Sequence, residues 1–275
     1  MIRRLKNKLF ATLCITTLTL GAVAAPSAFN SVQAASATSK IVYVDVEKNV
    51  MVRDPILQPV KVTVNDTETI CDATKDAVGT ANVDANTDGS YIKAFKDTDT
   101  SFSYDNYQFK NNLPAIVTDT TKAYKQQIVS DPNWLREKEY NGISGWMFTV
   151  NNTDHDSSYN YYTASTPVSS LPDGAVIRWE FSMACGCDLG NTGWMPDGTV
   201  TNGYYNWNTN STAAFFTRAD KTALITKLAI ATDLGLDDSN YAYNTAQNDL
   251  KNLTISQTDV NNAVTNLNNA IAQQQ

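Results

Sequence analysis

Along the chain, the spacing of apolar and polar residues changes character near Ala219. Before that point, apolar residues gather in short runs rich in β-branched and aromatic side chains, and residues 60–64 alternate strictly. Such runs predict strands. The other runs of this kind lie at residues 41–46, 145–150 and 175–181. A short helix is predicted at residues 72–78, with Gly79 as the residue that ends it. A partly helical segment is predicted at residues 122–136.

After Ala219, apolar residues recur at the spacing of one helix face in three successive segments. These residues are Leu224, Leu228 and Ala231; then Tyr243, Ala246, Leu250 and Leu253; then Val260, Ala263, Val264, Leu267 and Ile271. Residues 256–259 read Ser-Gln-Thr-Asp, a capping-box type of start for the third helix. Because only short polar loops separate the segments, we expect an antiparallel three-helix bundle.

The two patterns together predict the α+β class, with a strand-rich domain followed by a small three-helix bundle. All five Trp and eleven of the thirteen Tyr precede Ala219. We expect residues 35–190 to form the sheet domain, residues 191–218 a linker rich in Gly, Asn and Thr, and residues 219–275 the helical module.

The first 34 residues have the order of features found in a secretory signal peptide. Four positive charges and no acid precede an apolar run, and small residues follow it, ending at Ala34. The alternative is a membrane anchor, but the run is short for a bilayer and Pro26 follows it immediately. We therefore expect a secreted protein, without membrane insertion, that is released or held non-covalently at the cell surface.

The charge balance narrows the choice of partners. Without the leader, 17 of the 21 Lys and Arg remain against all 28 Asp and Glu, which gives a net charge near −11. An acidic chain with one histidine and no basic cluster argues against nucleic acid and anionic membranes. No G-x-S-x-G or H-E-x-x-H motif is present, and we expect no enzyme activity.

Three cysteines follow the leader, and an oxidising compartment favours one disulfide. A bridge from Cys71 to Cys185 or to Cys187 would tie an early strand to a late one. A ring closed between Cys185 and Cys187 would be strained. A Cys-x-Cys metal site is the further alternative, but no second Cys/His pair lies nearby.

Three ordered motifs carry a resemblance to a known family. Residues 144–151 read SGWMFTVN, residues 173–181 read DGAVIRWEF and residues 187–190 read CDLG. This set resembles the transcobalamin-like C-terminal domain family over about residues 60–190. The resemblance implies a β-grasp-like fold, in which a mixed sheet curls around a helix. The helical tail resembles the three-helix modules of Gram-positive surface proteins.

The chain departs from the family pattern in the loop where a ligand would lie. Family members have Asn-Gly after the strand and then a short loop with glycine, whereas this chain has Asn151-Asn152 and no glycine in residues 153–165. The stretch of residues 84–136 is also longer than expected.

The resemblance implies a flat ligand, with cobalamin or another corrinoid as the first candidate. The animal members of the wider family cover the second face of the corrin with a helical barrel, which this chain lacks, so a partner or a weaker affinity is implied. Aromatic side chains are available for one face. They are Trp146, Phe148, Tyr159, Tyr161, Tyr162 and Trp179. The alternative for Trp146, Phe148 and Trp179 is core packing, because strand alternation turns them to one side.

His155 is the only histidine and lies between Asp154 and Asp156 in the predicted loop. A neutral imidazole is a good axial ligand for cobalt, and flanking acids orient it. The alternative is a solvated loop histidine.

Calcium is a second cofactor candidate. Asp84, Asn86 and Asp88, followed by Gly89, match the first half of a calcium loop. Position 12 of such a loop is Phe95 instead of Glu, and a plain acidic turn explains the same residues.

Two functions follow. The first is an extracellular, non-catalytic binding protein that captures a corrinoid or similar small ligand, with a membrane uptake system as a possible partner. The second is a structural or adhesive surface protein that binds protein or wall polymer. A groove lined by Trp146 or Tyr161 favours the first function, and a flat tyrosine surface favours the second.

Overall fold

The computed structural model describes residues 38–99, 131–191 and 214–274, together with residues 102, 105 and 107–111 and four two-residue strands between 193 and 212. The predicted signal peptide and most of the helix predicted within residues 122–136 lie outside the described residues. From Ala37 onward the chain forms one compact unit.

The main sheet contains four strands in the order β2-β1-β7-β6. They are β1 (Ser39–Glu47), β2 (Leu57–Asn65), β6 (Gly145–Val150) and β7 (Ala175–Ser182). The central pair, β1 and β7, is parallel, and both outer strands pair antiparallel to their neighbours. The sheet is therefore mixed, as the β-grasp-like resemblance implies.

A second sheet has the antiparallel order β3-β4-β5. Its strands are β3 (Val83–Ala85), β4 (Ile92–Lys96) and β5 (Trp134–Arg136). The short elements are the 3-10 helices η1 (Asn49–Met51), η2 (Thr80–Asn82), η5 (Val168–Ser170) and η6 (Cys187–Leu189), and the strands β8 (Gly193–Trp194), β9 (Val200–Thr201), β10 (Tyr204–Tyr205) and β11 (Ser211–Thr212).

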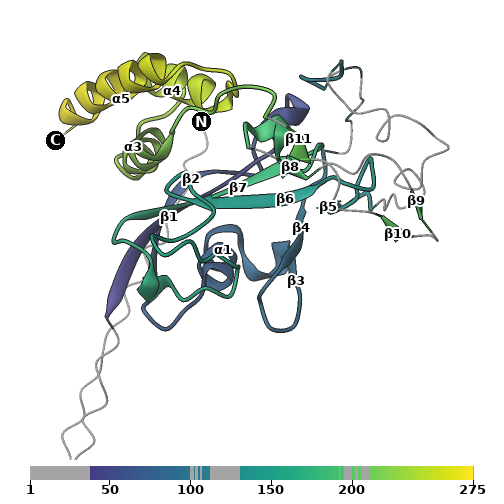
Figure 1. Ribbon diagram of the computed structural model, residues 1–275. Helices are drawn as coiled ribbons and strands as arrows, with labels where there is room; N and C mark the ends of the chain where they lie inside the picture. Colours follow the sequence, from purple (N-terminus) through teal and green to yellow (C-terminus); the bar gives the residue numbers. More distant parts are fainter. Residues whose placement is uncertain are drawn as a thin grey trace, which may run out of the picture. The chain divides into compact units, whose positions relative to one another are not determined.

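Helix α1 (Ile70–Val78) packs on one face of the main sheet (Figure 1). It begins two residues before the predicted start because Thr69 and Asp72 form a capping box that satisfies the first backbone N–H groups. The indole of Trp179 on β7 donates a hydrogen bond to the Thr74 hydroxyl at 3.0 Å, which fixes the helix against the sheet. Gly79, at φ 93°, ends the helix as predicted.

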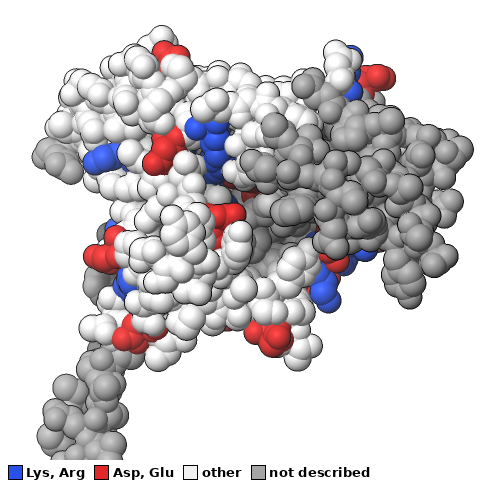
Figure 2. All heavy atoms as spheres, in the orientation of Figure 1, with Lys and Arg blue, Asp and Glu red and all other residues white. Residues whose placement is uncertain are grey.

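Helices α3 (Thr222–Asp233), α4 (Tyr241–Lys251) and α5 (Gln257–Ala272) pack together and lie over the other face of the main sheet (Figure 1). Asn240 caps α4, and Ser256 caps α5 as the sequence predicts. The α+β class with a three-helix bundle is thus confirmed. In the view of Figure 2, few charged side chains lie over these helices.

Both faces of the central strands are buried, which explains why their sequences read as nearly continuous apolar runs. On β1, Val42, Val44 and Val46 belong to the core that also contains α1. Tyr43 and Val176 turn to the opposite side and pack among the C-terminal helices. The helices therefore share a core with the sheet.

Charged residues lie on the same helix-facing side of the sheet, buried from solvent. Arg178 donates to both carboxylate oxygens of Glu47, at 3.1 and 2.8 Å, and forms an ion pair with Glu180 at 3.0 Å. Glu180 also pairs with Arg218 at 2.6 Å. We call Glu47, Arg178, Glu180 and Arg218 the buried ion network. In this network the negative charges of two carboxylates are matched by the positive charges of two guanidinium groups.

Replacing Arg178 by Met would leave Glu47 and Glu180 buried without their common partner. We expect the free energy of unfolding to fall by about 3–5 kcal/mol. Lys61→Met is the matched control, because the Lys61–Asp233 ion pair is exposed and its loss costs about 1 kcal/mol or less. Urea denaturation measures both variants, and equal losses would contradict a stabilising role for the buried ion network.

Candidate functional site

The loop between β6 and β7 begins with a tight turn. Val150 and Thr153 exchange backbone hydrogen bonds at 2.7 and 3.0 Å, and the two residues between them, Asn151 and Asn152, have φ values of 48° and 64°. A turn of this kind requires positive φ at both central positions, which asparagine tolerates. The two asparagines therefore suit the backbone that this turn requires.

Residues 153–163, here called the tyrosine loop, are held by internal hydrogen bonds. His155 and Tyr161 form an isolated β-bridge. A carboxylate oxygen of Asp156 accepts from the backbone N–H groups of Ser158 and Asn160, at 2.7 and 3.0 Å. These contacts give the loop a defined shape.

Three predicted ligand-binding residues meet on the surface of the tyrosine loop. The rings of His155 and Tyr159 stack with centroids 5.0 Å apart and planes 11° from parallel, and Tyr161 meets His155 edge-on at 6.4 Å. Tyr159 is 80% exposed and Tyr161 is 75% exposed. Tyr159 also has φ 63°, which is rare for a bulky residue. The loop therefore presents a preformed aromatic surface.

The orientation of the His155 ring is set by its neighbour. Nδ1 lies 2.7 Å from a carboxylate oxygen of Asp154, and an ionised carboxylate only accepts hydrogen bonds. In the neutral imidazole, Nδ1 therefore carries the proton and Nε2 carries the lone pair. Nε2 makes no hydrogen bond within the described residues.

Trp146 does not lie on this surface. Its side chain is 6% exposed, its indole N–H donates to the Leu135 carbonyl at 2.8 Å, and its ring packs edge-on against Phe95 at 4.7 Å. Phe148 is partly buried over Trp179, 4.6 Å away. The two strand residues thus follow the alternative of core packing, because alternation turns them toward α1.

Tyr162, the remaining residue of the predicted set, is half-buried and packs against the main core.

Of the predicted calcium residues, Asp84 lies in β3, and Asn86 and Asp88 lie in the turn between β3 and β4. All three have protein partners. Asp84 pairs with Arg136 at 2.6 Å. Asn86 accepts from the Tyr91 N–H, and Asp88 accepts from the backbone and hydroxyl of Ser90. Within the described residues, His, Cys, Asp and Glu form no group of three or more that could hold a metal ion.

Cys71 and Cys185 are free thiols in the structure, so the bridge predicted between them is not formed there. Cys71 lies at the start of α1, where its N–H donates to the Ala164 carbonyl. Cys185 and Cys187 follow the end of β7. The strained ring between Cys185 and Cys187 is also absent.

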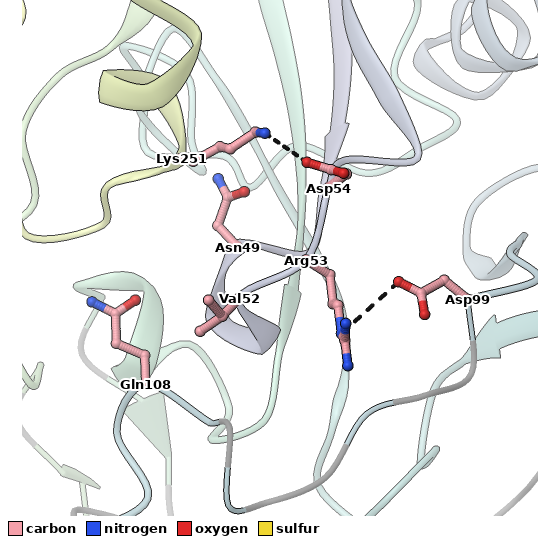
Figure 3. A pocket seen from close by; sticks show the side chains of 7 residues that line it. All are labelled: Asn49, Val52, Arg53, Asp54, Asp99, Gln108 and Lys251. Carbon is pink, nitrogen blue, oxygen red and sulfur yellow. Dashed lines mark hydrogen bonds and ion pairs between the residues drawn. The ribbon is translucent and has the colours of Figure 1, made fainter. Parts of the chain in front are cut away.

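A cavity of about 350 Å³ opens beside η1 and brings together three distant parts of the chain (Figure 3). We call it the η1 pocket. It is lined by Asn49, Val52, Arg53, Asp54, Asp99, Gln108 and Lys251. Asp54 and Lys251 form an ion pair at 2.6 Å, and Arg53 lies 3.9 Å from Asp99. The lining is polar, with both signs of charge.

Alternate residues connect the buried ion network to the η1 pocket. Asp45, Glu47 and Asn49 follow one another along the helix-facing side of β1 and into η1, and the Asn49 amide donates to Glu47. The pKa of Asp45 is raised well above its ordinary 3.8, first by burial and next by the negative charge of Glu47. Burial alone would raise the pKa of Glu47 too, but the charge and hydrogen bonds of Arg178 lower it.

Sequence reasoning missed both the buried ion network and the η1 pocket. One signal was present: residues 44–47 read Val-Asp-Val-Glu and residues 177–180 read Ile-Arg-Trp-Glu, so charged residues alternate with apolar ones inside two predicted strands. Opposite charges on two strands suggest pairing, but the parallel register of β1 and β7 was needed to bring them together.

In comparisons with known proteins, the chain matches no protein-family model, no curated protein and no solved structure. Within the described residues, none of the helices has the length and apolar character that crossing a membrane requires.

The raised pKa of Asp45 gives a pH dependence with a definite sign. Between pH 3.8 and the raised value, the folded state holds a proton that the unfolded state has lost, so the contribution of Asp45 to stability falls as pH rises. Asparagine mimics the protonated acid. We therefore expect the unfolding free energy of Asp45→Asn, relative to the native protein, to increase from about pH 4 upward.

The control is Asp54→Asn. A hydrogen bond from Lys251 lowers the pKa of Asp54, so its stabilising contribution is fully present above its ordinary pKa and is lost only in acid. Urea titrations across the pH range should give a difference that grows for Asp45→Asn and stays flat above about pH 5 for Asp54→Asn. A flat difference for Asp45→Asn would show that Asp45 is ionised in the folded protein.

Proposed function

We propose that this chain is an extracellular, non-catalytic binding protein that contacts its target through the tyrosine loop. The observation that carries the proposal is the exposed cluster of His155, Tyr159 and Tyr161 on a loop fixed by its own hydrogen bonds. A fixed loop loses little conformational freedom on binding, and covering an exposed aromatic ring contributes about 1.5–3 kcal/mol. The secreted location rests on the predicted signal peptide.

A corrinoid is the first ligand to test. The motifs at residues 144–151, 173–181 and 187–190 resemble those of the transcobalamin-like family. The available Nε2 of His155, with Nδ1 held by Asp154, has the arrangement expected of an axial ligand to a metal. Only one face of a flat ligand would be covered, so the proposal includes modest affinity or a second protein, such as a membrane uptake system.

A surface component, either protein or wall polymer, is the second candidate target. The high exposure of Tyr159 and Tyr161, together with the burial of Trp146, favours a tyrosine surface over a groove lined by these residues. Tyrosine supplies a large contact area with few rotatable bonds, which suits adhesive contacts.

Titration of the purified chain with aquocobalamin tests the first candidate. We expect saturable binding by calorimetry and a shifted visible spectrum, because an imidazole nitrogen replaces the bound water. His155→Ala should abolish the spectral shift, and Tyr159→Ala should weaken binding about tenfold through the loss of ring contact. An unchanged spectrum after His155→Ala would rule out His155 as the cobalt ligand.

The matched control is Tyr241→Ala. Tyr241 is 86% exposed, as the loop tyrosines are, but lies at the start of α4. Its replacement should leave cobalamin binding unchanged. Absence of heat with both cobalamin and cobinamide would contradict the corrinoid proposal.

Sedimentation of the chain with purified Gram-positive cell walls tests the second candidate. We expect the double variant Tyr159→Ala, Tyr161→Ala to lose most of the wall-bound fraction, because both exposed rings are removed. Tyr241→Ala should sediment like the native chain. Equal sedimentation of all three proteins would show that the tyrosine loop makes no wall contact.

A further inference from the structure

The η1 pocket has the size of a small-molecule site. Its volume of about 350 Å³ lies within the range of known ligand pockets. A neighbouring cavity of about 530 Å³ shares Asp54 and Asp99 with it. The two cavities together would accommodate more than one ring of a ligand.

Two neutral amides in the η1 pocket have hydrogen-bonding capacity that the protein leaves unused. Asn49 is 6% exposed, its Nδ2 donates to Glu47, and its Oδ1 has no hydrogen-bond partner in the described part of the chain. A buried acceptor without a partner is unfavourable unless something else supplies the donor. The side-chain amide of Gln108 also makes no hydrogen bond to the described residues, and Figure 3 shows it standing apart from the ion pairs.

The charged groups of the pocket are, by contrast, already paired with one another. Lys251 contacts Asp54, and Arg53 faces Asp99, as the dashed lines of Figure 3 mark. A charged ligand would have to break one of these pairs to find an opposite charge. A neutral ligand can use the open amides and share the outer hydrogen-bonding positions of the charged groups.

Val52 adds an apolar contact. It is 63% exposed and has φ 55°, a conformation that a β-branched residue rarely adopts. This backbone conformation places its methyl groups at a polar pocket, where the C–H face of a ring could cover them. Strained residues of this kind concentrate at binding sites.

From these features we infer that the η1 pocket binds a neutral, hydroxylated ligand of mono- or disaccharide size. Each sugar hydroxyl both donates and accepts a hydrogen bond, so it can donate to Asn49 Oδ1 and accept from the Gln108 amide. The ring C–H groups pack on Val52. This site is separate from the tyrosine loop and does not depend on the function proposed for that loop.

The test is a calorimetric titration of the full chain with D-glucose, D-galactose and N-acetyl-D-glucosamine, and with L-alanyl-L-alanine as a zwitterionic probe. We expect saturable binding of at least one sugar at millimolar concentration and no binding of the dipeptide. Gln108→Leu, which replaces an exposed amide by an apolar side chain of similar shape, should weaken sugar binding roughly tenfold.

Two further variants separate binding from folding. Gln274→Leu makes the same change at an exposed glutamine of the C-terminus and should leave sugar affinity unchanged. Val52→Gly relieves the left-handed strain, so it should weaken sugar binding while the thermal midpoint stays the same or rises.

Three outcomes would overturn the inference: no heat with any of the three sugars, saturable binding of the dipeptide in their place, or equal sugar affinity in Gln108→Leu and Gln274→Leu. Tyr159→Ala, which tests the tyrosine loop, should not alter sugar affinity at the η1 pocket. Failure of one site is therefore distinguishable from failure of the other.

Discussion

The pairing of Glu47 with Arg178 is the interaction on which the arrangement of this protein depends. It joins the two central strands of the main sheet across their parallel register, and through Glu180 it reaches Arg218, just ahead of the C-terminal helices. Charged groups tolerate such burial only when every partner is in place. The helices must therefore cover this face of the sheet for the charges to be shielded, and the sheet must keep its register for the charges to meet.

The same pairing fixes the position of the η1 pocket. Glu47 receives hydrogen bonds from Arg178 on one side and from Asn49 on the other, so the last residue of β1 links the protein interior to a residue that lines the pocket. A binding group that is held by a buried partner pays little entropy when a ligand arrives. The tyrosine loop achieves a comparable rigidity by different means, through a turn with two left-handed asparagines and the carboxylate of Asp156.

Much of the fold follows from the periodicity of the sequence, because strands and helices bury one side of their residues in a regular order. The strand runs were predictable for this reason. The helix end at Gly79 and the capping of α5 by Ser256 were predictable from the residue types that favour helix ends. The exposure of Tyr159 and Tyr161 followed from their place in a polar loop. Other features depend on contacts between distant residues: the burial of Trp146 needed Phe95, and the η1 pocket needed Lys251 to approach Asn49. The spacing of apolar residues along the chain does not predict such contacts between distant residues.

The parallel pairing of β1 with β7 has a consequence for the order in which the chain acquires its structure. Residues 48–174 separate the two strands, whereas β1 and β2 are near neighbours in sequence. As the chain is synthesised from its amino end, β1 and β2 can associate early, but β1 must wait for β7 before its second edge is filled. During that interval Glu47 lacks its partner Arg178, and Val44 has no paired strand on the side that β7 later fills. The half-built sheet is then an open template for other strands, and the period of greatest exposure to misassociation ends only when the segment around Arg178 arrives.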